Sequence, residues 1–244
     1  MTKLAIFFHL GNYSLWPEFK QYLTNIFEAG YNTDLYVSYQ EISPILDEIK
    51  QLYPQSIFIE CKNKLGLDIG GKLLSFDYAL RAGKEYDYFL SLHTKTDPKW
   101  RRELILPICG SASTVRECIN VFNQNPNVGI IGARTYVDRF TPTNNINHSI
   151  QQDLCQKWQL TYKNVMSHQS PLRFVAGTIF WMRWSIISRF AREKKIDFRK
   201  EYARLEPGYF KNVRPTFTHA WERMFGILTY HYGYHIHPMD LKKS

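Results

Sequence analysis

The stretch from Lys64 to Asp97 constrains the fold of this chain more than any other. A glycine-rich loop and an apolar helical pattern lead through a tight turn into a short apolar run, Asp87 to Leu92. A continuous apolar run of this length is typical of a central strand that is covered on both faces. The polar cluster His93 to Asp97 follows at once, before Pro98. Because α/β proteins present their chemistry at the carboxyl ends of such strands, we predict an active site here.

Strand and helix patterns alternate along the rest of the chain, which predicts βαβ units and an α/β fold with a mostly parallel sheet flanked by helices. The expected strands are 4–9, 33–38, 57–59, 87–92, 128–132, 173–183 and 234–237; the expected helices begin near residues 15, 43, 70, 100, 113, 184 and 218. The pattern fades between residues 133 and 169, where we expect a substrate lid. Without an internal repeat or a linker, a single domain is preferred.

Composition limits the classes of partner. The chain of 244 residues is 44% hydrophobic, enough for a real core, and carries a formal charge of +9. That charge favours anionic partners, namely nucleotide phosphates, nucleic acid or an acidic lipid surface. The aromatic residues suit either the core or stacking on sugars and bases. Since no helix-turn-helix, zinc-finger or RNP-like motif is present, nucleic-acid binding is the weaker alternative.

The four cysteines lack metal-binding or disulfide spacing and are typical of reduced thiols. The first apolar run is too short for a signal peptide, and no segment has the roughly 20 apolar residues of a membrane span. These features predict a cytoplasmic protein that touches a membrane only from its surface.

Two further segments suggest binding roles. Asp68, Gly70 and Gly71 open a helical pattern, where backbone N–H groups could approach a phosphate, although Asp68 as a simple helix cap explains them too. His9 and Asn12 follow the first expected strand, where they could touch a nucleotide base.

Three pieces of the sequence carry a family resemblance. They are LGLDIGGKLLSFDYAL, YDYFLSLHTKTDPKWR, and FVAGTIFWMR with HAWERMFGILTYHYGYHI. Together they resemble the rhamnan synthesis protein F family of bacterial surface polysaccharide assembly. The resemblance implies a glycosyltransferase with a GT-A-like, Rossmann-type fold. It also implies a nucleotide-sugar half at residues 1–132 and an acceptor half at residues 133–244.

The wider GT-A group usually ends the central strand in Asp-x-Asp, which holds a divalent cation such as Mg²⁺ or Mn²⁺. This chain has His93-Thr94-Lys95 instead. Two alternatives therefore stay open: Lys95 neutralises the diphosphate without a metal, or Asp97 and His93 contribute to a cation site.

The resemblance also places a catalytic base at the start of a late helix. Glu222 is the leading candidate, and His219 competes with it. The structural alternative is a surface pair of Glu222 with Arg223 or an internal salt bridge. Arg173, Gly177 and Arg183 belong to the expected strand before that helix and are candidates for diphosphate or acceptor contacts.

The expected activity is transfer of rhamnose or a related hexose from a nucleoside-diphosphate sugar to a lipid-linked glycan, at the cytoplasmic face of the inner membrane. Asp68, Gly70 and Gly71 would shape the donor site, and His93 and Lys95 would meet the diphosphate. A non-catalytic glycan-binding or nucleic-acid-binding protein is the alternative.

Overall fold

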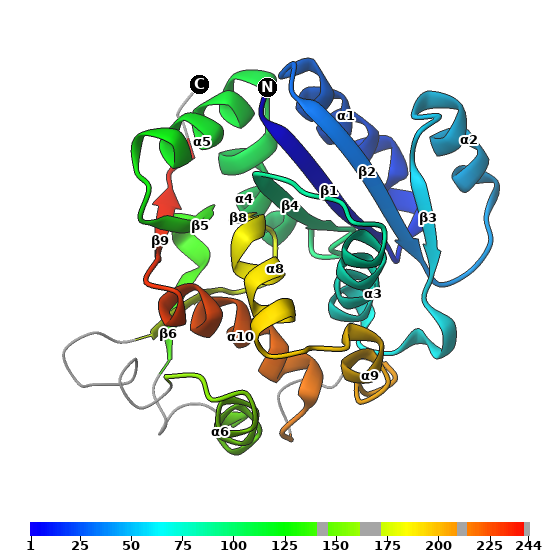
Figure 1. Cartoon of the computed structure of the whole chain (residues 1–244). Coiled ribbons are helices and arrows are strands. Elements are labelled where there is room, and N and C mark those ends of the chain that lie inside the picture. The colour runs from blue at the N-terminus through cyan, green and yellow to red at the C-terminus, as the bar shows by residue number, and fades with distance from the viewer. Residues whose placement is uncertain (141–145, 162–171, 209–213, 242–244) are drawn as a thin grey trace.

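A computed structural model describes residues 1–140, 146–161, 172–208 and 214–241. Its centre is a seven-stranded sheet in the order β3-β2-β1-β4-β8-β5-β9 (Figure 1). The bounds of these strands are β1 Lys3–Leu10, β2 Asn32–Tyr39, β3 Ile57–Glu60, β4 Tyr88–His93, β5 Val128–Ala133, β8 Phe180–Arg183 and β9 His235–Met239. The strands are parallel except β8, which runs antiparallel to β4 and β5. The predicted mostly parallel α/β sheet is confirmed.

Helices cover both faces of this sheet. One face carries α1 (Trp16–Glu28), α4 (Pro98–Cys109) and α5 (Ala112–Gln124), and the other carries α3 (Leu67–Arg81), α8 (Trp184–Glu193) and α10 (Phe217–His231). The remaining helices are α2 (Pro44–Leu52), α6 (His148–Lys157) and α9 (Phe198–Tyr202), with 3-10 turns at Tyr13–Leu15, Lys62–Lys64 and Arg134–Tyr136. Within the described ranges, no helix combines the length and hydropathy needed to cross a membrane.

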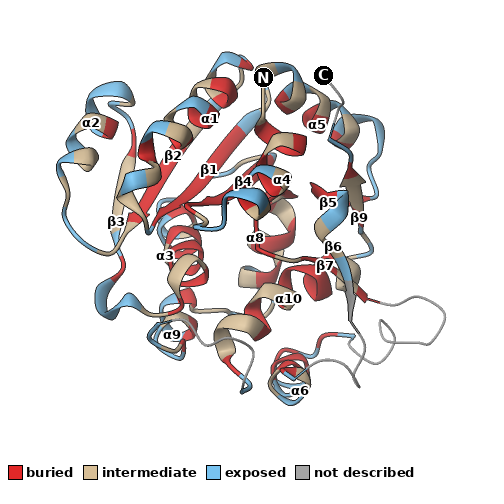
Figure 2. Cartoon of the chain, turned by 180° about the vertical axis from the view of Figure 1, so that it is seen from behind, coloured by how far each residue is buried: buried red, intermediate tan, exposed pale blue. Residues whose placement is uncertain are grey.

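The central strands are buried on both sides, as the apolar run in β4 predicts (Figure 2). On the α3 face, Phe7 of β1 packs edge-on against Phe76 of α3, with ring centroids 5.2 Å apart. Phe89 of β4 and Trp184 of α8 complete this aromatic cluster. Each such pair adds about 0.5–1.5 kcal/mol to simple burial, so α3 and β4 are held firmly together.

The expected strand at residues 173–183 is wrong in one respect, because it is two strands. β7 (Leu172–Val175) pairs with β6 (Val137–Phe140) in a separate two-stranded sheet, whereas β8 belongs to the central sheet. The break lies at Gly177 and Thr178, whose φ angles are +87° and +54°. A backbone in this left-handed conformation cannot continue a strand.

The segment predicted to be a patternless lid contains a strand, β6, and a helix, α6. Residues 141–145 and 162–169 of that expected lid lie outside the described residues. Residues 194–204, which are rich in charged side chains, contain α9, whose buried Phe198 packs against Phe76 of α3. Both helices have weak sequence signals because each has few apolar residues.

Candidate functional site

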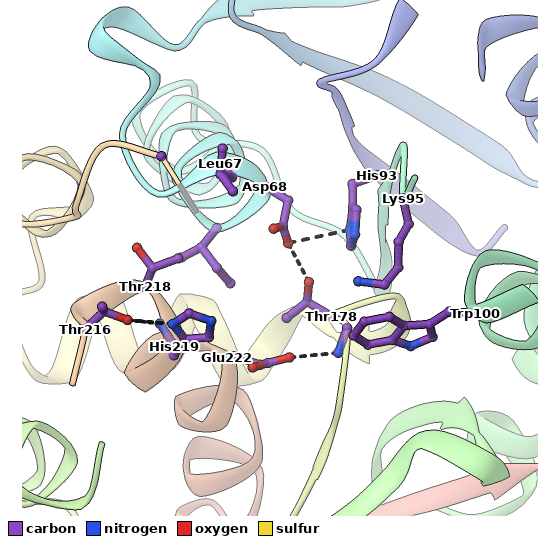
Figure 3. A pocket seen from close by; sticks show the side chains of 13 residues that line it. Leu67, Asp68, His93, Lys95, Trp100, Thr178, Thr216, Thr218, His219 and Glu222 are labelled. Carbon is purple, nitrogen blue, oxygen red and sulfur yellow. Dashed lines mark hydrogen bonds and ion pairs between the residues drawn. The ribbon is translucent and has the colours of Figure 1, made fainter. Parts of the chain in front are cut away.

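Two adjoining pockets open where β1 and β4 end. The smaller, about 120 Å³, is bounded by α10 and the β7–β8 turn, and the larger, about 530 Å³, extends along the loop that follows β1. They share part of their lining, which is Leu67, Asp68, His93, Lys95 and Trp100 (Figure 3). In the sheet, β2 and β3 lie on one side of β1 and β4 lies on the other. The strand order therefore reverses between β1 and β4, and open α/β sheets bind ligands at such a switch point.

Asp68 lies in the first turn of α3 and is the centre of a buried polar network. Its Oδ2 accepts hydrogen bonds from Lys72 Nζ at 2.5 Å and from Thr178 Oγ1 at 2.5 Å. Burial opposes the charge of this carboxylate, but the Lys72 ammonium nevertheless holds the pKa of Asp68 well below its usual range. Asp68 therefore stays ionised, and it ties α3 to the β7–β8 turn.

Asp68 is not the helix cap that the sequence also permitted. Gly66, with φ +65°, stands at the N-cap of α3, and no side chain caps this end. Gly70 and Gly71 are helical and buried, and neither lines the two pockets. A Cβ on Gly71 would crowd Ser38 and His9, so its position lets α3 approach β1 and β2 closely.

His9 and His93 face each other as register partners at the ends of β1 and β4. His9 Nδ1 lies 3.0 Å from Ser38 Oγ, and His93 Nδ1 lies 3.5 Å from Asp68 Oδ2. Burial lowers the pKa of His9 to about 4 and that of His93 to about 3. Both imidazoles are neutral near pH 7 and offer hydrogen bonds rather than charge to the larger pocket.

Hydrogen bonds to the Thr94 hydroxyl and to two backbone carbonyl groups fix the loop after β4. Thr94 Oγ1 accepts the N–H groups of Gly11 and Asn12, at 2.9 and 2.8 Å. Buried Arg101 donates to the carbonyl oxygens of Lys95 and Thr96, at 2.7 and 3.1 Å, while Glu18 neutralises its charge. This loop therefore has a defined course.

The Lys95 side chain extends from this fixed loop to the junction of the two pockets. Its Nζ lies 3.2 Å from the centroid of the Trp100 ring. Burial lowers the pKa of Lys95, as expected for a cation held away from water. Within the described part of the chain, no hydrogen bond or ion pair joins the Lys95 ammonium to an acidic residue, and nearby carboxylates act on it only through longer-range electrostatics.

The other wall of the smaller pocket comes from the start of α10. Thr216 caps this helix, and its Oγ1 lies 2.7 Å from His219 Nδ1. Glu222 Oε1 accepts the N–H of Gly177 at 2.7 Å, and its Oε2 lies 3.6 Å from Arg223. Glu222 and His219, the two predicted bases, line the same pocket as Lys95 and Asp68.

These residues do not fit a divalent cation. Asp97 caps α4 by accepting the N–H of Trp100 at 2.7 Å, and the Asp68 carboxylate is engaged by Lys72 and Thr178. Across the described ranges, no group of at least three His, Cys, Asp or Glu side chains gathers in a geometry that could hold a metal. Two carboxylates with these engagements are poor ligands for Mg²⁺ or Mn²⁺.

The remaining candidates lie as follows. Asn12 lines the larger pocket and caps the turn that follows β1, and Gly177 lines the smaller one. Arg183 donates to the carbonyl oxygens of Val128 and Phe122, at the end of β4 opposite His93. Arg173 is in β7, and neither arginine lines the two pockets.

Three residues in or next to the pockets escaped prediction from the sequence. Lys72 and Thr178 are 106 positions apart yet hydrogen-bonded at 3.2 Å, so nothing local connects them. Trp100 looked like an ordinary helical residue. Lys72 follows Asp68 by four residues on the buried face of α3, so a search for i,i+4 ion pairs would have found this pair.

The fold and the pockets define an α/β protein with a candidate site of mixed charge at the strand switch point of its sheet. The chain belongs to the rhamnan synthesis protein F family, whose family model matches residues 1–234. The resemblance seen in the sequence is thereby confirmed, and it supports a glycosyltransferase-like role.

No curated protein matches the chain in sequence. Among solved structures, 4-diphosphocytidyl-2C-methyl-D-erythritol synthase is similar with 12% identity and a TM-score of 0.42, over 94% of this chain and 98% of that one. Mouse xyloside xylosyltransferase 1, apo form, is similar with 13% identity and a TM-score of 0.37, over 98% and 84%. At these scores neither likeness bears on the function.

Proposed function

We propose that this protein is a glycosyltransferase that moves rhamnose or a related hexose from a nucleoside diphosphate to a lipid-linked or oligosaccharide acceptor of a surface polysaccharide. Family membership supports the class of reaction. The observation that carries the proposal is a cation, Lys95, and a carboxylate, Glu222, that line one pocket at the strand switch point.

The donor would occupy both pockets. The larger one, of about 530 Å³, would take a nucleoside along His9, Asn12 and Gln40, with the diphosphate against Lys95 at the junction. A lysine neutralises phosphate charge as a point charge without a metal. The sugar would then lie in the smaller pocket, beside Glu222.

In the reaction, an acceptor hydroxyl attacks the anomeric carbon of the sugar while the bond from that carbon to the diphosphate oxygen breaks. Glu222 takes the hydroxyl proton, and the diphosphate leaves with the bonding electrons. The hydrogen bond from Gly177 fixes Glu222 Oε1, and Oε2, which lies 3.6 Å from Arg223, would take the proton of the acceptor. Lys95 stabilises the charge that develops on the leaving group.

His219 is the second candidate for the base. Burial lowers its pKa, so the ring is neutral near pH 7, and Thr216 fixes its orientation through Nδ1. Glu222→Gln and His219→Gln separate the two roles, because the variant that lacks the base loses turnover by about 10²-fold or more and retains donor binding.

The proposed acceptor also determines where in the cell the protein would act. A lipid-linked glycan would bring it to the cytoplasmic face of the membrane, and the net charge of +9 supports contact with an acidic lipid surface.

A thermal-shift series with dTDP, UDP, GDP and CMP, each with and without Mg²⁺ or Mn²⁺, tests the proposal. A ligand that binds only the folded state raises the melting temperature. We expect a shift for one nucleoside diphosphate that does not require metal and is lost in Lys95→Met. If none of the nucleotides shifts the transition, the donor site is refuted and a glycan-binding role replaces it.

A further inference from the structure

Trp100 lines both pockets, yet it has no place in the reaction proposed above. Its ring is held on several sides. Tyr136 stacks on it with ring centroids 5.8 Å apart, and the Tyr136 hydroxyl is itself held by Glu103 at 2.5 Å. Gly177 lies so close that a Cβ there would come within 3.2 Å of the indole nitrogen. The indole is therefore a rigid wall.

The Lys95 ammonium rests on this wall, 3.2 Å from the ring centroid. Attraction between a cation and an indole face is strongest where water is excluded, and Lys95 is half-buried. In Figure 3 the Lys95 side chain ends in the pocket beside the Trp100 ring. A lysine carries three N–H donors, so an ammonium held on a ring face can still donate to an incoming anion.

Carboxylates that would compete for Lys95 are close by. Asp68, Glu222 and Asp97 all contribute to the electrostatic environment of its ammonium. Asp68 is already neutralised by Lys72, and Asp97 is engaged at the start of α4. Glu222 has a basic partner, Arg223, only at 3.6 Å, so Glu222 is the main competitor. An ion pair between Lys95 and Glu222 would occupy the diphosphate subsite and the candidate base together.

We infer that Trp100 is a positioning residue, which keeps the Lys95 ammonium at the junction of the two pockets and away from Glu222, ready for the diphosphate of the donor. The inference rests on the proposed function, since it concerns the same site. It assigns to Trp100 the selectivity for a diphosphate over a ligand without phosphates.

The contact itself can be tested without any ligand. Lys95→Met should change the tryptophan emission of the wild-type protein, because an ammonium beside an indole alters its fluorescence. In a Trp100→Phe background the same lysine substitution should leave the emission of the other tryptophans unchanged. An equal change in both backgrounds would show that Lys95 does not rest on Trp100, and it would overturn the inference.

Calorimetric titration with UDP, dTDP and GDP tests the role. Trp100→Leu should weaken binding of the accepted diphosphate about tenfold, and Trp100→Phe, which keeps an aromatic face, less than about threefold. The corresponding nucleoside without phosphates should bind all variants equally. In a Lys95→Met background, Trp100→Leu should have no additional effect, because Trp100 acts through Lys95.

The outcomes separate the two proposals. If the wild-type protein binds no nucleoside diphosphate, the proposed function fails and the role of Trp100 falls with it. If diphosphates bind but Trp100→Leu lowers their affinity equally with or without Lys95, Trp100 only lines the pocket and the inference alone is overturned. Melting temperatures of all variants identify any that are not folded.

Discussion

At the scale of single residues, the ion pair of Asp68 and Lys72 is the most sensitive contact of the site. The Lys72 side chain is 1% exposed, so Asp68→Asn would leave a buried ammonium without its carboxylate. We expect this substitution to lower the free energy of unfolding by about 3 kcal/mol, the range found when one partner of a buried pair is removed. Urea denaturation at pH 7 measures the loss.

Asp77→Asn is the matched control, because Asp77 lies on the same helix and also pairs with a basic residue four positions later, Arg81. The side chains of Arg81 and Arg199, its two partners, are 58% and 62% exposed. Water can solvate them when the carboxylate is removed, so the loss should be below about 1 kcal/mol. Equal losses in the two variants would contradict a special role for burial at Lys72.

At the scale of elements, the turn between β7 and β8 joins the two walls of the smaller pocket. Gly177 has φ +87°, and a Cβ there would lie 2.8 Å from Leu104. Gly177→Ala should therefore combine backbone strain of about 1–3 kcal/mol with crowding of similar size. Chemical denaturation measures the stability, and displacement of this turn, which lines the smaller pocket, should weaken donor binding in parallel.

Gly30→Ala is the control that isolates the effect of backbone strain from that of crowding. This glycine has nearly the same φ, +85°, and a Cβ there would meet nothing within 4 Å. We expect Gly30→Ala to lose stability through strain alone and to leave donor binding unchanged. If it destabilises the protein as much as Gly177→Ala does, crowding at the β7–β8 turn is not significant.

The same turn marks where prediction from sequence stopped. β1, β4, α3 and α10 were predictable because their patterns are local and strongly periodic. The run RFVAGTIFWMR is uniformly apolar, so its division between two sheets has no local signal besides one glycine. Tertiary pairing with β6 on one side and with β4 on the other decides the break.

The site divides in the same way. His93, Lys95 and Glu222 were predictable together because each stands at a strand end or a helix start, which the topology brings to one edge. Thr178 reaches Asp68 and Lys72 only through the tertiary fold, and Tyr136 and Gly177, which hold Trp100, are also distant in the sequence. Arg183 looked like a site residue, but the antiparallel direction of β8 carries it to the other end of the sheet.

At the scale of the whole molecule, buried histidines make the stability depend on pH. In the described part of the chain, burial lowers the pKa of five histidines, His9 and His93 most clearly, to about 4 and about 3. In the unfolded chain these rings have a pKa of about 6.5. Between that value and the folded values, the unfolded state binds more protons, so protonation favours unfolding.

The stabilising contribution of the neutral rings is therefore fully present above about pH 6.5 and is lost as the pH falls toward 4. For His9 and His93 together, the slope of the free energy of unfolding against pH should approach about 2.7 kcal/mol per pH unit, since each proton contributes about 1.4 kcal/mol. Urea midpoints at pH 7, 6 and 5 measure it. His93→Gln should remove about half of this slope, because Gln preserves a polar group next to Asp68 and does not titrate. A slope that is unchanged in this variant would mean that the pH dependence comes from other groups, and that His93 is not the buried neutral ring that its position beside His9 requires.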